Sequence, residues 1–81
     1  MERKEIYTRL EELFETVIDE GKVTLNDNTT AKDVSGWDSL SHIQLIVAIE
    51  KHFDIKFTSD EILSWKNVGE IVDSISEKIN K

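Results

Sequence analysis

Asp38, Ser39 and His42 lie close together in the sequence and have side chains of the types that do chemistry. Ser39 stands where Gly36-Trp37-Asp38 meets a strongly apolar stretch, which is the expected start of a helix. The N-terminus of a helix leaves backbone N–H groups unpaired and carries partial positive charge, so it is a favourable place for a phosphate. Ser39 is therefore a candidate to carry a phosphodiester. An ordinary serine at a helix start is the alternative that these residues leave open.

The same three residues also supply the side-chain types of a hydrolytic triad. Ser39 and His42 are i, i+3 neighbours on the expected helix. A triad, however, needs a base that a third group orients inside a pocket that limits water. The exposed start of one helix in an 81-residue chain offers no such pocket. The Gly-x-Ser-x-Gly elbow is absent, and Trp37 interrupts the similarity to a Gly-Asp-Ser-Leu hydrolase motif. We therefore expect no hydrolytic site at these residues.

Metal-binding patterns are weak in this sequence. His42 and His52 are ten residues apart and have no paired-ligand spacing, and the chain has no cysteine, which excludes disulfides and zinc–thiolate sites. The Asn26-Asp27-Asn28 segment lacks the aspartate pattern and the twelfth-position glutamate of a calcium loop. Weak divalent-ion binding to clustered acids would relieve self-repulsion, but we expect no dedicated metal site.

Helices are the elements expected to position these residues. Apolar residues recur at spacings of three and four from Ile6 to Ile18, which predicts a first helix that Gly21 ends. A long loop follows over residues 22–36, and its apolar residues should pin it to the core: Val23, Leu25 and Val34. A second helix is predicted from about Ser39 to His52. Its apolar stripe is wider than one buried face requires, so part of it should face a partner.

Two capping patterns predict the remaining helices. Thr58-Ser59-Asp60-Glu61 fits a capping box and should open a short helix. Asn67 with Glu70 repeats the device before a last helix. The chain is thus expected to form three substantial helices and a short one, in one domain over residues 1–81. Trp37 and Trp65 are expected to be packing residues, because no basic groove accompanies them as in a stacking platform.

The charge of the chain restricts its partners. Seventeen acids against ten bases give a net charge of −7, which argues against nucleic acid and anionic membranes and favours basic protein surfaces. No apolar run approaches the roughly 20 residues of a membrane span, and the charged start at Met1-Glu2-Arg3 does not fit a signal peptide. We expect a cytoplasmic protein.

Three segments together closely resemble an acyl carrier protein: Asp38-Ser39-Leu40, the helix pattern Ile43-x-x-Ile46-Val47-x-Ile49-Glu50, and Phe53-Asp54-Ile55-Lys56-Phe57. The resemblance covers nearly the whole chain. It implies an all-α four-helix bundle whose third helix is short, with a long loop between the first two helices. It also implies that a phosphopantetheinyl transferase modifies Ser39, using coenzyme A and magnesium held by the transferase. The attached 4′-phosphopantetheine ends in a thiol that carries acyl groups as thioesters. The resemblance therefore also implies a carrier that is not itself an enzyme and has no catalytic residues.

The resemblance further implies roles for surface and core residues. Asp38 is the acid that the transferase recognises, and the partner-facing residues are an apolar patch and an acidic rim: Leu40, Ile43, Val47, Glu50, Asp60 and Glu61. The expected partners are acyl-loading, ketosynthase or acyltransferase-type enzymes with basic docking surfaces. The carrier itself is expected to be a monomer. The core, which in some family members accepts the acyl chain, should contain Ile6, Leu10, Val17, Ile46, Phe53, Ile62, Val68, Ile71 and Val72.

Three positions depart from the pattern of carriers in housekeeping fatty acid synthesis. Ser41, Gln44 and Lys51 stand where those carriers commonly have acids, and this weakens steering toward enzymes that need a negative second helix. We therefore predict a specialised pathway, such as polyketide or modified-sugar assembly. Peptidyl and aminoacyl carriers share the fold and the serine, and they are the alternative. They more often show Gly-Gly-x-Ser, whereas Asp38 favours the acyl branch. A small acidic adaptor without modification is a third possibility.

Overall fold

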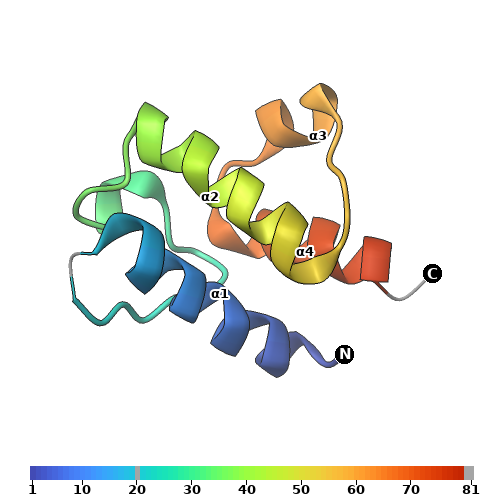
Figure 1. Cartoon of the computed structure of the whole chain (residues 1–81), viewed down its shortest axis with the longest axis horizontal. Coiled ribbons are helices and arrows are strands. Elements are labelled where there is room, and N and C mark those ends of the chain that lie inside the picture. Colours follow the sequence, from blue (N-terminus) through green and yellow to red (C-terminus); the bar gives the residue numbers. More distant parts are fainter. Residues whose placement is uncertain (20, 80–81) are drawn as a thin grey trace.

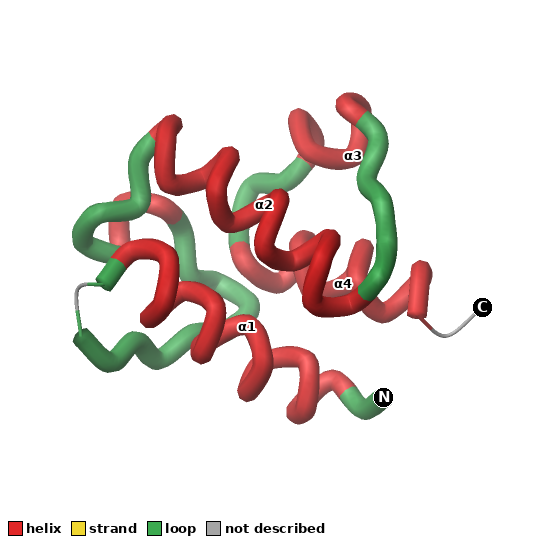
Figure 2. The backbone as a smooth tube through the Cα atoms, viewed as in Figure 1, coloured by secondary structure: helices red, strands yellow, loops and turns green. Residues whose placement is uncertain are grey.

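A computed structural model describes residues 1–19 and 21–79 of the chain. These residues form four α-helices and one short 3-10 helix, without a β-strand among them (Figure 1, Figure 2). The helices are α1 (Arg3–Ile18), η1 (Ala31–Asp33), α2 (Ser39–Phe53), α3 (Ser59–Ser64) and α4 (Val68–Ile79). α1 packs against both α2 and α4, whereas the short α3 lies beyond α2 on the other side from α1 (Figure 1). The predicted four-helix architecture with a short third helix is confirmed.

The core lies where α1, α2 and α4 meet. α1 contributes a stripe at intervals of four, Ile6, Leu10 and Phe14, and each of these side chains is almost fully buried. The largest buried side chains of the other two helices are Leu45, Ile49, Val68, Val72 and Ile75. Burial of each such side chain contributes about 1.5–3 kcal/mol relative to exposure, so this cluster holds the three long helices together.

Most of the predicted core residues are buried. Ile6, Leu10, Ile46, Val68, Ile71 and Val72 are confirmed as buried. Val17 and Phe53 are only partly buried, because each lies in the last turn of its helix, where the core ends. Ile62 is also partly buried, since it belongs to the short outer helix α3. Besides the loop residues Leu25 and Val34, which were predicted separately, the core contains four buried helix residues that the predicted list omitted: Phe14, Leu45, Ile49 and Ile75.

The end of α1 differs from the prediction. Asp19 adopts the left-handed conformation with φ 56°, and its N–H donates to the Glu15 carbonyl at 3.1 Å. The helix therefore ends at Ile18, and the prediction that Gly21 ends it is wrong. Aspartate is one of the few residues other than glycine that tolerate this conformation, since its short polar side chain can bond locally. Asp54 ends α2 in the same way, with φ 55°.

The long loop between α1 and α2 is anchored at several points. Leu25 and Val34 are buried and Val23 is half-buried, as predicted. The Leu25 N–H donates to the Glu11 carboxylate at 2.8 Å, and the Val68 N–H donates to the Thr29 carbonyl at 2.8 Å. These contacts fix the loop, and with it η1, against α1 and the start of α4.

The loop passes the start of α4 so closely that a glycine is needed there. The Gly69 N–H donates to the Asp27 carbonyl at 3.1 Å, and a Cβ added at Gly69 would lie 2.8 Å from that oxygen. Arg3 adds two ion pairs across the same junction, to Asp27 at 2.8 Å and to Asp73 at 2.6 Å. The Tyr7 hydroxyl also donates to Asp27. The beginnings of α1 and α4 are thus tied through one loop residue.

Within the described residues, no helix combines the length and the apolar character that crossing a membrane requires.

Candidate modification site at Ser39

The chain turns into α2 through a short, fully bonded segment. Gly36 has φ +83°, a conformation that glycine adopts without strain. Asp38 is the N-cap of α2, and its carboxylate accepts from the Ser41 N–H at 3.0 Å. The Ser41 hydroxyl in turn accepts from the Asp38 N–H at 2.8 Å and donates to the Gly36 carbonyl at 2.8 Å. This reciprocal capping box joins Asp38, just before Ser39, to Ser41, two residues after it, and so holds the backbone at Ser39 in place.

Ser39 is the first residue of α2, and its side chain is exposed. No hydrogen bond to its hydroxyl is formed within the part of the chain that the structure describes. The capping contacts use the N–H groups of Ser41 and His42, and the Leu40 N–H also interacts with the Asp38 carboxylate. The Ser39 N–H makes no hydrogen bond to another described residue, as is usual for the first N–H groups of a helix. An anion attached at Ser39 would lie beside these donors and the positive end of the helix dipole.

The carboxylate beside Ser39 is ionised at neutral pH. The Ser41 backbone N–H donates to Asp38 and holds the pKa of that carboxyl below its usual range. Asp38 is also exposed, so it can present its charge to a basic partner while it caps the helix. The role predicted for it in transferase recognition stays a prediction.

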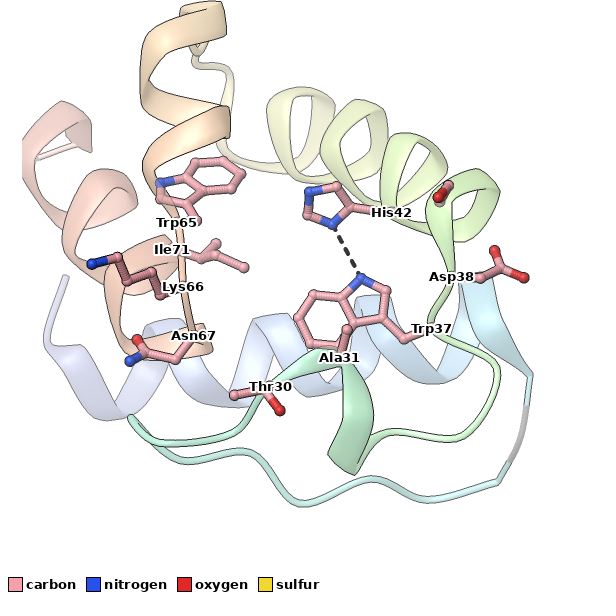
Figure 3. Close-up of a pocket in the computed structure, with 10 residues that line it drawn as sticks. Thr30, Ala31, Trp37, Asp38, His42, Trp65, Lys66, Asn67 and Ile71 are labelled. Carbon is pink, nitrogen blue, oxygen red and sulfur yellow. Dashed lines mark hydrogen bonds between the residues drawn. The ribbon is translucent and has the colours of Figure 1, made fainter.

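A groove of about 400 Å³ opens beside Ser39 (Figure 3). Its walls come from four parts of the chain: the region of η1, the first turn of α2, the α3–α4 turn and α4. They include Thr30, Trp37, Ser39, His42, Trp65 and Ile71. The volume is in the range of about 300–1,000 Å³ that is typical of small-molecule sites. The expected core residue Ile71 thus also lines this groove.

Aromatic rings form a continuous series along this groove. The Trp37 indole N–H donates to His42 Nδ1 at 3.1 Å, and the Trp65 indole N–H donates to the Ser74 hydroxyl at 2.9 Å. Trp37 also meets the buried Phe14 edge to face, with ring centroids 4.9 Å apart. Both tryptophans are therefore packing residues, as predicted, and in addition they form walls of the groove.

The state of His42 does not suit a hydrolytic triad. Burial lowers the pKa of His42, which favours the neutral ring. Because an indole N–H can only donate, Nδ1 must be the unprotonated nitrogen and Nε2 must carry the hydrogen. Nδ1 is thus occupied and Nε2 is already protonated, so His42 cannot take a proton from Ser39 in this arrangement.

The predicted apolar patch lies on one exposed face of α2. Leu40, Ile43 and Val47 follow one another at spacings of three and four, and their exposed fractions are 68 %, 60 % and 45 %. Leu63 of α3 is 83 % exposed and was not among the predicted partner residues. Its position in a short helix with little apolar periodicity gave no signal of this exposure. Recognition of partners by this face stays a prediction.

The predicted acidic rim is partly engaged within the molecule. The Glu50 carboxylate accepts from the Phe57 N–H at 2.9 Å. Glu61 accepts from the Thr58 N–H at 2.8 Å and pairs with Lys78 at 3.0 Å, and these contacts lower the pKa of Glu61. Asp60 is exposed. Glu50 and Glu61 therefore stabilise the α2–α3 loop and α3, whatever they contribute to partner recognition.

Two of the three departures lie on the surface. Gln44 and Lys51 are exposed, whereas Ser41 is only 8 % exposed and serves the capping box. The expectation that Ser41 is a surface determinant overlooks this role, although the Asp38-x-x-Ser41 spacing carries the signal. No residue from Ser39 to Ile49 has a charged side chain, so the first charged residue of α2 is Glu50.

Comparisons with known proteins agree with this geometry. A family model described as a phosphopantetheine attachment site matches residues 8–75. The chain is 32 % identical over 81 residues to an acyl carrier protein of Guillardia theta, with 98 % of each covered. It is 30 % identical over 76 residues to one of Acidothermus cellulolyticus, with 94 % of this chain and 90 % of that protein covered. A solution structure of a holo acyl carrier protein from Geobacter metallireducens superposes with a TM-score of 0.85 at 39 % identity. The superposition covers 91 % of this chain and 85 % of the Geobacter chain.

Proposed function

This chain belongs to the acyl carrier protein family, whose members are carriers rather than enzymes and hold 4′-phosphopantetheine covalently, and we propose that Ser39 is its attachment residue. In the transfer from coenzyme A, the Ser39 Oγ–P bond replaces the bond from phosphorus to the nucleotide. The hydroxyl proton is lost and the nucleotide bisphosphate leaves. The bound group supplies a thiol for thioester chemistry, and the chain supplies its placement.

The surroundings of Ser39 support this proposal. Its hydroxyl is exposed and has no internal partner among the described residues, so a transferase can reach it. The positive N-terminal end of α2, where Ser39 is the first residue, suits a phosphodiester oxygen. The capping box between Asp38 and Ser41 holds Ser39 on a rigid element. The single observation that carries the proposal is this free hydroxyl at the first position of a capped helix inside the matched family region.

Intact mass spectrometry tests the attachment. The protein is incubated with coenzyme A, Mg²⁺ and a promiscuous phosphopantetheinyl transferase, and we expect one phosphopantetheinyl addition that Ser39→Ala abolishes. Ser59→Ala is the matched control, because Ser59 is also an exposed serine at the first position of a capped helix. Full modification of the Ser39→Ala protein would contradict the proposal.

Thiol titration gives an independent reading. The chain contains no cysteine, so the apo protein should show no reactive thiol and the holo protein one. A thiol count of zero after a confirmed addition would show that the added group is not phosphopantetheine.

We further propose that this carrier serves a specialised acyl-assembly pathway. Enzymes that recognise a carrier by a strongly negative second helix would find only uncharged side chains from Ser39 to Ile49 here, and a positive one at Lys51. Electrostatic complementarity mainly controls the association rate, so such enzymes should bind this carrier slowly. Partners that use its exposed apolar face would not depend on those charges.

A ketosynthase assay tests the pathway proposal. Holo protein loaded with malonyl groups is offered to the general fatty acid ketosynthase of the host, and we expect slower turnover than with the housekeeping carrier. Gln44→Glu with Lys51→Glu should raise turnover and make it sensitive to salt. Lys4→Glu, a charge reversal on the exposed side of α1, should change neither. Wild-type turnover equal to that of the housekeeping carrier would contradict the proposal.

A further inference from the structure

His42 has a fixed hydrogen-bonding state within the groove beside Ser39. Its Nδ1 accepts from the Trp37 indole N–H, so Nε2 carries the ring hydrogen. Among residues 1–19 and 21–79, Trp37 is the one hydrogen-bond partner of the His42 imidazole, whereas the His42 backbone N–H donates to the Asp38 carbonyl. Figure 3 shows the imidazole between the two indoles, with its second nitrogen on the side of Trp65. A donor of fixed direction thus faces the groove.

The other polar groups around the groove are already bonded or point elsewhere. The Trp65 indole N–H donates to Ser74, and the Thr30 hydroxyl is paired with Asp33. The side chains of Lys66 and Asn67 run away from His42 (Figure 3). Near His42, the groove therefore offers two indole rings and one N–H donor.

The position of His42 relative to Ser39 decides what this arrangement can bind. The two residues are i, i+3 neighbours on α2, so His42 lies one turn further along the face that bears Ser39. Both line the same groove. A flexible chain attached to the Ser39 hydroxyl and laid along the groove therefore passes His42 soon after its phosphate. The attached arm contains two amide groups, and an amide combines a flat surface with a carbonyl acceptor.

We propose that His42 is a positioning residue for the arm, with its Nε2–H donating to an amide carbonyl of the arm while Trp37 and Trp65 flank it. This inference rests on the proposed attachment at Ser39. The groove provides one donor for one acceptor, and its indoles provide apolar surface for the adjoining methylene and methyl groups. The arm is then held against the carrier beside α2, instead of extending freely into solvent.

Nuclear magnetic resonance of the apo and holo proteins tests the inference. The chain has two tryptophans and both line the groove, so both indole N–H signals report on this site. We expect both signals to shift on modification, and we expect nuclear Overhauser contacts between the arm and the indole rings. A long-range ¹H–¹⁵N spectrum of the His42 ring should show the Nε2–H form in both states, with a shift of Nε2 in the holo form. This last measurement needs no variant.

A pair of substitutions separates the two nitrogens of His42. His42→Asn keeps an acceptor near the Nδ1 position for Trp37 but lacks a donor at the Nε2 position, so the contacts between arm and indoles should be lost. His42→Gln keeps a donor near the Nε2 position, so these contacts should persist while the Trp37 indole signal moves to the shift of a free N–H. His52→Asn is the matched control, because His52 is an exposed histidine of the same helix.

The outcomes distinguish this inference from the proposed function. A holo protein with the correct mass but no contact between arm and indoles would overturn the inference and leave the attachment intact. Absence of the mass addition itself would instead contradict the attachment at Ser39. Contacts of wild-type strength in His42→Asn would show that His42 does not position the arm. If that variant does not fold, an Nε2 signal that is unchanged between apo and holo wild type would overturn the inference equally.

Discussion

Replacing Ser41 by alanine should destabilise the protein, because Ser41 serves the helix cap and not the partner surface. The side chain is buried, accepts from the Asp38 N–H at 2.8 Å and donates to the Gly36 carbonyl at 2.8 Å. Alanine can make neither bond. The segment that carries Ser39 would then lose two of the contacts that hold it at the start of α2.

The expected magnitude follows from these two bonds. An intramolecular hydrogen bond contributes about 0.5–1.5 kcal/mol net, so losing two gives about 1–3 kcal/mol. Loss of a helix cap typically costs about 0.5–2 kcal/mol, which overlaps this range. For a domain of this size, each 1 kcal/mol lowers the melting temperature by about 4–8 °C. Exposed substitutions away from such contacts usually stay within about 0.5 kcal/mol.

Urea unfolding of the apo proteins measures the difference. We expect Ser41→Ala to lower the midpoint without changing the slope, because the same surface is exposed on unfolding. Ser59→Ala, at the first position of α3, is the control and should stay near wild type. A loss below about 0.5 kcal/mol for Ser41→Ala would show that the cap does not depend on this hydroxyl and would return Ser41 to the set of surface determinants.

Two further predictions concern the loop and the groove. Gly69→Ala should destabilise the protein by about 1–3 kcal/mol in urea unfolding, because the alanine Cβ would lie 2.8 Å from the Asp27 carbonyl oxygen. This cost should outweigh the higher helix propensity of alanine. Stability equal to wild type would show that the loop at Asp27 moves aside without cost. Burial lowers the pKa of His42 below its ordinary 6.5, so as the pH falls through about 6.5 the unfolded chain binds the proton first. The contribution of His42 to stability should then be complete above about pH 6.5 and decline below it, until the folded state also binds the proton. Thermal melts across this range should show a smaller decline for His42→Asn, and an equal decline would mean that other groups cause it.

The helices could be predicted from the sequence because their signals are local. Apolar spacing of three and four marked α1, and the Thr58 to Glu61 capping box opens α3 as expected, with both of its hydrogen bonds formed. The Asn67 and Glu70 pair behaves differently. Asn67 accepts from the Glu70 N–H at 3.0 Å, but the Glu70 carboxylate accepts from the Lys66 N–H and not from Asn67. Local patterns thus predicted the helices but not every hydrogen-bond partner at their ends.

The groove and the uses of the acidic residues could not be predicted in the same way. The groove is lined by residues far apart in the sequence, such as Thr30, Ser39 and Trp65. They come together because the long loop folds back and the α3–α4 turn approaches α2. The Glu50 carboxylate bonds the Phe57 N–H seven residues further on, which depends on the path of the α2–α3 loop. Such contacts arise from tertiary packing, and no local periodicity records them. The Trp37–His42 bond spans only five residues, yet two side chains of these types have many other possible partners.

Attachment of the arm at Ser39 can be tested on the carrier isolated from its own host, because fragment-ion mass spectrometry locates a modification at a single residue. We predict one phosphopantetheinyl or acyl-phosphopantetheinyl group on the peptide that contains Ser39, with fragment ions assigning it to that serine. The released thioester would also identify the cargo, and an aminoacyl group would favour the peptidyl-carrier alternative. A modification on any other hydroxyl, or an unmodified protein that is active in its host, would contradict the assignment of Ser39.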